Sequence, residues 1–67
     1  MKINKRNVQI AMFNKRMTQG TLAKQSGISR QTINTILARG TCKIDSAVKI
    51  AEALDLSPAE IVDVEAL

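Results

Sequence analysis

Residues 18–36 read TQGTLAKQSGISRQTINTI, and this stretch decides the fold. Thr18 and Ser29 are residue types favoured at the N-cap of a helix, and each precedes apolar residues at helical spacing. In both cases the residue before the cap and the fourth helical residue are apolar, so the two can pack together and fix the direction in which the chain starts the helix. The pattern predicts two short helices, over about residues 19–25 and 30–38.

The turn between these helices is short, because only Ser26, Gly27, Ile28 and Ser29 are available for it. Such a turn needs a left-handed backbone near the end of the first helix, and Gly27 adopts one without the steric penalty of a Cβ atom. The spacing is typical of a helix-turn-helix unit over about residues 19–38, although an ordinary helical hairpin shares this kind of turn.

The rest of the sequence predicts three more helices and no strand. We expect the first over about residues 4–14, the fourth after Asp45 as N-cap, and the last after Ser57, with Glu60 completing a capping box. A chain of 67 residues has room for one hydrophobic core only. We therefore expect an all-α domain of five helices over residues 1–67.

Composition excludes several functions. The chain has no His and a single Cys, so we expect no metal ion, haem or other cofactor and no intramolecular disulfide. Nucleophiles lack a neighbouring base, so we expect no enzyme. The chain is too short for a second, ligand-sensing domain, so we expect no small-molecule ligand. One Phe, with no Tyr or Trp, argues against stacking on single-stranded nucleic acid. No membrane span or signal peptide is evident, and we expect a soluble, cytoplasmic protein without a membrane partner.

The net charge of +4 is distributed unevenly along the chain. Residues 1–43 contain nine Lys or Arg residues and no Asp or Glu, whereas residues 44–67 contain one Lys and six acidic residues. The two parts therefore carry +9 and −5. Such a distribution attracts a polyanion to one part of the molecule. Nucleic acid fits better than a membrane, because no large apolar face accompanies the cations. A merely soluble basic surface is the alternative.

Residues 18–36 resemble the helix-turn-helix of the lambda-type phage repressor and Cro family (XRE family), whose pattern is T-Q-x-x-L-A-x-x-x-G-I-S-x-x-x-I-x-x-I. Residues 49–57, KIAEALDLS, are similar to the family's K-I-A-x-A-L-x-V-S segment. The resemblance covers about residues 8–62. It implies a five-helix lambda-repressor-like domain and a regulator, a repressor on a palindromic operator, with double-stranded DNA and a second copy in a homodimer as partners. The alternative is an antitoxin or adaptor acting mainly through protein contacts.

Two features depart from the family pattern. The family commonly pairs an Arg in its first helix with a Glu near the end of the recognition helix, and the matching positions here are Met12 and Leu37. Because apolar residues can replace a buried ion pair without loss of stability, we expect these two side chains to touch. The loop over residues 38–43 also differs in length, and its glycine, Gly40, comes one residue late.

The second helix of the unit, the expected recognition helix, carries short polar side chains along one arc and apolar ones along the other. Arg30 suits guanine O6 and N7, Gln31 and Asn34 suit adenine N6 and N7, and the methyl group of Thr35 suits that of thymine. The positions of Arg30 and Gln31 match frequent base readers of the family. We expect all four to read bases, with solvated or phosphate-directed side chains as the alternative.

A second set of residues is expected to contact phosphates. Gln19 matches the family's phosphate-contacting Gln, and the free N–H groups at the start of its helix favour an anion. Thr18 already caps that helix, so its phosphate contact is secondary. The remaining members are basic or polar residues next to the two helices: Arg16 or Lys15, Arg39, Thr41 and Lys43. Such contacts set the position of the protein on DNA rather than the sequence that it selects.

The C-terminal residues 61–67 are more apolar than a frayed end requires. Part of them can cover the core, and the rest can join two subunits. We expect the dimer interface there, at Ile61, Val64 and Leu67. In the loop, Cys42 lies next to Lys43, which favours the thiolate and makes a redox switch conceivable, but we expect an ordinary loop or half-buried thiol.

Overall fold

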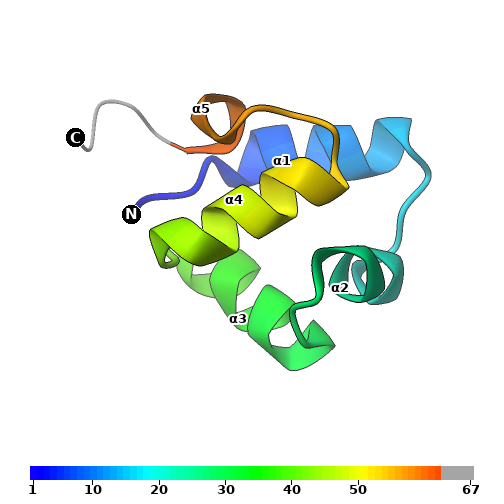
Figure 1. Ribbon diagram of the computed structural model, residues 1–67, viewed down its shortest axis with the longest axis horizontal. Coiled ribbons are helices and arrows are strands. Elements are labelled where there is room, and N and C mark those ends of the chain that lie inside the picture. The colour runs from blue at the N-terminus through cyan, green and yellow to red at the C-terminus, as the bar shows by residue number, and fades with distance from the viewer. Residues whose placement is uncertain (63–67) are drawn as a thin grey trace.

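The computed structural model describes residues 1–62, which form five helices and no strand (Figure 1). The helices are α1 (Lys5–Asn14), α2 (Gln19–Ser26), α3 (Arg30–Arg39), α4 (Ile44–Ala53) and α5 (Pro58–Ile61). Helix α4 contacts both α2 and α5, while α1 contacts α5 and α2 packs on α3. The expected all-α fold is confirmed. None of the helices in residues 1–62 combines the length and apolar character that a bilayer crossing requires.

The first three helices begin at the expected caps. The side-chain oxygens of Asn4, Thr18 and Ser29 each accept the N–H of the residue three positions later, at 3.1–3.2 Å. Such bonds satisfy N–H groups that have no partner within the helix. Gly27 ends α2 with φ of 74°, the left-handed backbone that the tight turn requires. Local sequence therefore sets both boundaries of the α2–α3 turn.

Helix α4 begins earlier than expected, and the prediction of Asp45 as its cap is wrong. The helix starts at Ile44, because the N–H of Ala47 bonds to the carbonyl of Lys43 at 3.0 Å. This register buries the apolar residues Ala47, Ile50 and Ala51. Asp45 lies in the first turn instead, where a carboxylate interacts favourably with the helix dipole. At α5 the expected glutamate contact is present, since Glu60 Oε2 accepts the N–H of Ser57 at 2.8 Å.

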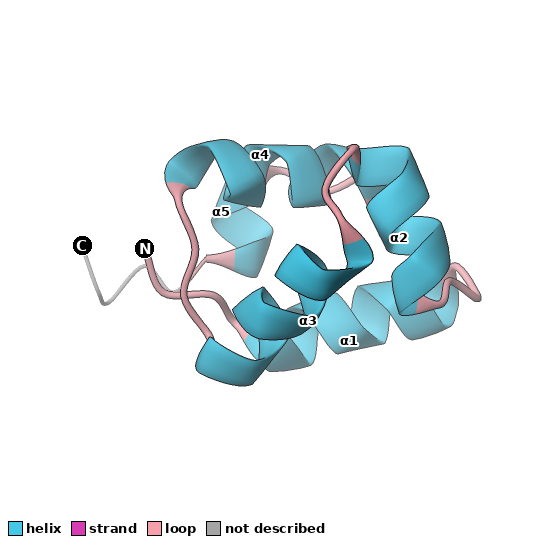
Figure 2. Cartoon of the chain, turned by 90° about the horizontal axis from the view of Figure 1, so that it is seen from below, coloured by secondary structure: helices cyan, strands magenta, loops and turns pink. Residues whose placement is uncertain are grey.

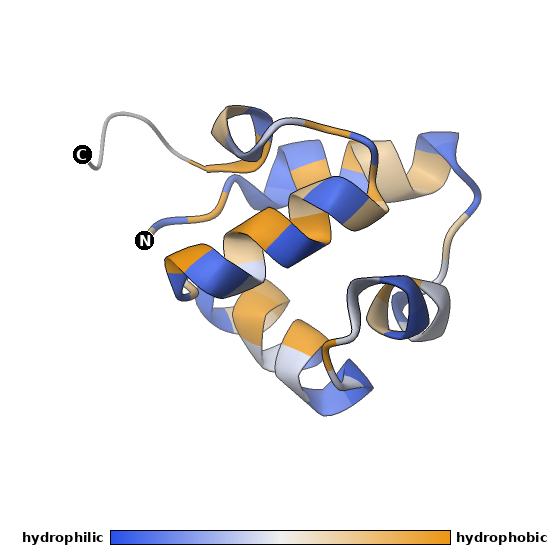
Figure 3. Cartoon of the chain, in the orientation of Figure 1, coloured by the Kyte–Doolittle hydropathy of each residue, from blue (hydrophilic) through white to orange (hydrophobic). Residues whose placement is uncertain are grey.

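The core is built from the inner faces of all five helices, from Ile3 before α1 and from Leu54 at the C-cap of α4. Figure 3 shows how α4 turns a hydrophobic side and a hydrophilic side in different directions. The buried hydrophobic residues are Ile3, Val8, Met12, Leu22, Ile33, Ile36, Ala47, Ile50, Ala51, Leu54 and Ile61. Leu37 is half-buried and packs against this core, to which Met12 also belongs. Their direct contact stays a prediction.

Ile61 belongs to the core, and its assignment to a dimer interface is wrong. Its side chain is 0% exposed, because α5 packs against α4 and α1 and presses it inward. A side chain without exposed surface has none to offer a second copy. The other two residues expected at that interface, Val64 and Leu67, lie outside the described residues.

The residues before α1 form an extended segment that the sequence did not predict. Met1–Asn4 lies between the loop after α3 and the end of α5, and its backbone is hydrogen-bonded to both. Ile3 is only 6% exposed and anchors the segment in the core. Figures 1 and 2 both show the N-terminus beside the loop that joins α3 to α4. The segment therefore belongs to the folded domain.

Candidate nucleic-acid interface

Helix α3 has one buried face and one exposed face. Ile33 and Ile36 are buried at 0% and 6% exposure, and they hold the helix against the core. Figure 2 looks onto the other side of α3, with no other element in front of it. All four residues expected to read bases are exposed: Arg30, Gln31, Asn34 and Thr35. The structure thus places them on an accessible face, where a DNA groove can reach them.

Hydrogen bonds within α3 affect these four side chains differently. The hydroxyl of Thr35 donates to the carbonyl of Gln31 at 3.0 Å. That bond occupies the hydroxyl and leaves the methyl group as the contact surface, which suits the expected approach to a thymine methyl. Within residues 1–62, the charged and amide groups of Arg30, Gln31 and Asn34 bond to no other side chain or backbone group. These groups are therefore available to an outside partner.

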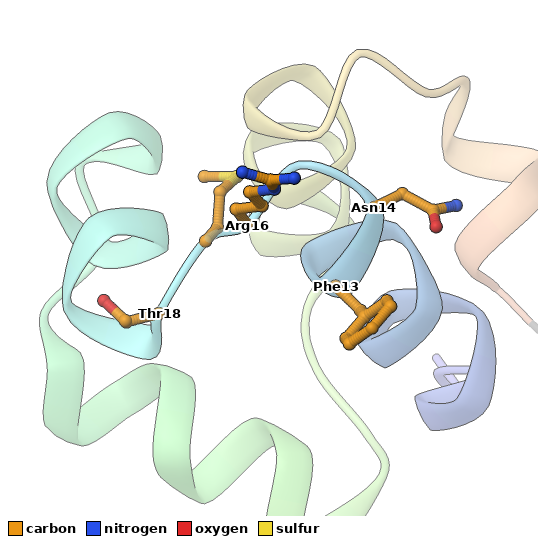
Figure 4. Close-up of a pocket in the computed structure, with 5 residues that line it drawn as sticks. Phe13, Asn14, Arg16 and Thr18 are labelled. Atoms are coloured by element: carbon orange, nitrogen blue, oxygen red, sulfur yellow. The ribbon is translucent and has the colours of Figure 1, made fainter.

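The turn between α1 and α2 forms a hollow that five residues line, Asn14 and Met17 among them. Phe13 at the end of α1, Arg16 in the turn and Thr18 at the start of α2 line it, as Figure 4 shows. Phe13 is 82% exposed, and sequence reasoning gave it no role. The signal was present, because Phe13 lies away from the core-facing positions Val8 and Met12 when α1 is drawn as a helical wheel.

Of the two cations in this turn, one is neutralised. Lys15 forms an ion pair with Asp55 in the turn after α4. Arg16 is exposed and forms no ion pair within residues 1–62. Its φ of 56° lies in the left-handed region, which costs a residue with a Cβ atom about 1–2 kcal/mol. Of the two alternatives, Arg16 is therefore the one free to contact phosphate, next to Gln19 at the N-terminus of α2.

The loop after α3 provides the other expected phosphate contacts. Gly40 ends α3 with φ of 73°, and its N–H bonds to the carbonyl of Ile36 at 2.7 Å. Arg39, Thr41 and Lys43 on either side of this turn are exposed. They lie at the C-terminal end of α3, whereas Gln19 and Arg16 come from the elements that precede it. Although Gly40 comes one residue later than the family's glycine, it still caps the C-terminus of α3.

Cys42 in this loop is not the reactive thiolate that its neighbour suggested. Burial raises the pKa of the Cys42 thiol, and this effect outweighs the positive Met1 amino group and the hydrogen bond of Ala47, which both lower the pKa. A thiol with a raised pKa is a poor nucleophile at neutral pH. Cys42 is half-buried, in line with the expected ordinary thiol, and its backbone N–H donates to the carbonyl of Met1 in the N-terminal segment at 3.0 Å.

The positive charge on this side of the molecule is largely unneutralised. Among residues 1–62 the one ion pair is that of Lys15 and Asp55. The described acidic residues all belong to α4, α5 or the turn between them: Asp45, Glu52, Asp55 and Glu60. The N-terminal part, which includes α2 and α3, contains no acid. A surface of this kind attracts a polyanion such as DNA.

An exposed polar α3, packed on α2 across a left-handed glycine turn, defines a helix-turn-helix DNA-binding domain. The Cro/C1-type HTH DNA-binding domain family matches residues 7–66, and the chain belongs to this family. It is thus a DNA-binding regulator of transcription, and double-stranded DNA is its partner. Domains of this family are typically not enzymes. Comparison with curated proteins and with solved structures found no match.

Proposed function

We propose that this protein is a transcriptional repressor that binds a palindromic operator as a homodimer. The observation that carries the proposal is the exposed face of α3, which presents three side chains able to bond to base edges in a part of the chain without acidic residues. Residues 1–67 act as one domain in this proposal, and the cytoplasm is its proposed location.

In the complex, α3 enters the major groove with its N-terminal residues against the bases. Arg30 bonds to guanine, Gln31 and Asn34 to adenine, and these contacts select the sequence. Phosphate contacts on both sides of α3 hold the helix in position. They come from Gln19, Thr18, Arg16, Arg39, Thr41 and Lys43. A repressor acts in this scheme by occupying the operator.

Two copies are needed because one copy is too small to read a whole palindrome. The Cα trace measures 29 × 22 × 17 Å, whereas two half-sites read from the same side of the duplex lie about 34 Å apart. A single short helix also makes few base contacts. A symmetric dimer doubles them and matches the two-fold symmetry of the operator.

Selection from a library of random duplexes at two salt concentrations tests this function. We expect one enriched, two-fold symmetric sequence, and a logarithm of the binding constant that falls by several units per unit of the logarithm of salt concentration. Sedimentation of the complex should show two protein chains per duplex. Weak binding without an enriched sequence would contradict the proposal and favour the adaptor or antitoxin instead.

A further inference from the structure

The N-terminal segment, Met1–Asn4, is held against the loop that follows α3. The N–H of Ile3 donates to the carbonyl of Gly40 at 2.8 Å, and the N–H of Cys42 donates to the carbonyl of Met1 at 3.0 Å. Lys2 and Thr41 thereby form an antiparallel bridge. The segment is a fixed neighbour of the residues expected to contact phosphate at the C-terminal end of α3.

The pairing determines the direction of the Lys2 side chain. In an extended segment successive side chains point to opposite sides, and Ile3 points into the core at 6% exposure. Lys2 therefore points outward, and it is exposed. Residues opposite one another in an antiparallel pair have their side chains on the same face, so Lys2 and Thr41 lie side by side.

Lys5 at the start of α1 joins the same surface. Its Cδ and Cε atoms lie 3.8 Å from the point that a Cβ atom of Gly40 would occupy. The aliphatic part of Lys5 thus covers the end of α3, while the residue remains exposed. Neither Lys2 nor Lys5 forms an ion pair within residues 1–62. Together with Arg39 and Lys43, they gather four cations around one helix end.

We propose that Lys2 and Lys5 form a second phosphate-binding site, which extends the contacts of the α3–α4 loop along the same DNA strand. The inference rests on the proposed function and deepens it, since it names residues outside the helix-turn-helix that bind the backbone. Cations concentrated beside a helix in the major groove have the phosphates of the groove edge as their nearest anions. Because the backbone of Met1–Asn4 is already fixed, binding DNA costs this segment little conformational entropy.

A purely structural role for Lys5 predicts a different result. A positive charge near the C-terminus of α3 also stabilises the helix dipole. That effect changes the free energy of unfolding and leaves the number of released counterions unchanged. The salt dependence of DNA binding therefore separates a phosphate contact from a contribution to folding.

The test compares three variants of the full chain on the duplex that the wild-type protein selects. Lys2→Gln with Lys5→Gln should reduce the magnitude of the slope of log affinity against log salt by about 3.6 units for the dimer, since it removes two contacts from each copy and each contact contributes about 0.9. Lys2→Arg with Lys5→Arg should keep the wild-type slope. The control Lys49→Glu changes the net charge equally, from the exposed side of α4, and should alter the slope by much less.

The outcomes separate the two proposals. A glutamine variant with the same slope as Lys49→Glu overturns the second phosphate site, even if its free energy of unfolding falls. The selected sequence should be the same for the wild-type protein and the glutamine variant, because backbone contacts do not read bases. If the wild-type protein itself selects no sequence, the proposed function fails, and the slopes on an arbitrary duplex still decide whether Lys2 and Lys5 bind phosphate.

Discussion

Helices α3 and α4 are both ten residues long, and each buries an apolar stripe, yet their exposed faces differ in chemistry. The exposed face of α3 carries Arg, Gln, Asn and Thr without any acid. The exposed face of α4 carries Asp45, Lys49 and Glu52. The buried faces of both helices contribute to the hydrophobic core, whereas only the exposed face of α3 suits a DNA groove.

This contrast also orients the molecule. The acidic residues of α4 and α5 repel phosphate, and the cations around α2 and α3 attract it. We expect a protein with this distribution to approach DNA with α3 in front before any base is contacted. The separation of charge along the sequence is only partly a separation of faces, because α4 contacts α2 and α5 contacts α1 (Figure 1). The ion pair of Lys15 and Asp55 forms where the two parts meet.

The largest expected effect is on the free energy of unfolding, to which the buried faces of α3 and α4 should contribute equally. Ile33→Ala in α3 and Ile50→Ala in α4 each remove a buried side chain, so each should lower the free energy of unfolding by about 2–5 kcal/mol. Urea unfolding measures both. If one variant lost less than about 1 kcal/mol, the two helices would not share the core equally.

Removal of one positive charge from the exposed face of α3 or of α4 should affect DNA sequence selection very differently. Arg30→Ala should cost about 1–3 kcal/mol of discrimination at one base pair and relax the preference there. Lys49→Ala removes the same charge from α4 and should leave the selected sequence intact. Selection from random duplexes, followed by titration of single-base variants, measures both. An unchanged selected sequence with Arg30→Ala would show that α3 is placed wrongly in the groove.

The replacement of the family's Arg–Glu pair by Met12 and Leu37 can be tested directly. Met12 and Leu37 should interact with a coupling free energy of at least about 0.5 kcal/mol, because they replace two charged residues that touch in the family. The single variants Met12→Ala and Leu37→Ala and the double variant form the cycle, measured by chemical unfolding. Additive effects would mean that the two side chains pack against the core separately.

The smallest expected effect compares two left-handed turns, one in the basic part and one in the acidic part. Arg16 and Asp55 have φ of 56° and 57°, so Gly at either position should raise the free energy of unfolding by about 0.5–1 kcal/mol. The gain at Asp55 should be smaller, because its ion pair with Lys15 is lost.

DNA binding should distinguish these two variants. Arg16→Gly should also reduce the magnitude of the salt slope by about 1.8 units for the dimer, since one phosphate contact disappears from each copy. Asp55→Gly should leave that slope nearly unchanged. Equal slopes for the two variants would show that Arg16 does not contact phosphate. The strained backbone of Arg16 would then have no functional explanation.

Most of the fold could be predicted because its signals are local. Thr18, Ser29 and Gly27 determine helix ends through hydrogen bonds and φ values that reach only three or four residues along the chain. The exposed polar face of α3 followed from helical periodicity in the same way. The start of α4 could not be predicted, because the packing of Ala47 and its neighbours outweighs the preference of Asp45 for a cap.

The sequence by itself determined the helix boundaries around Gly27, the two faces of α3 and the separation of charge, since each depends on residue type and short spacing. Only the tertiary structure decided three other features: that Ile61 is buried, that Cys42 is covered and that Met1–Asn4 pairs with the loop after α3. The backbone hydrogen bonds around these features join residues 37 to 57 positions apart in the chain. Such contacts form because the whole core closes around them, and no local pattern encodes a pairing of that range.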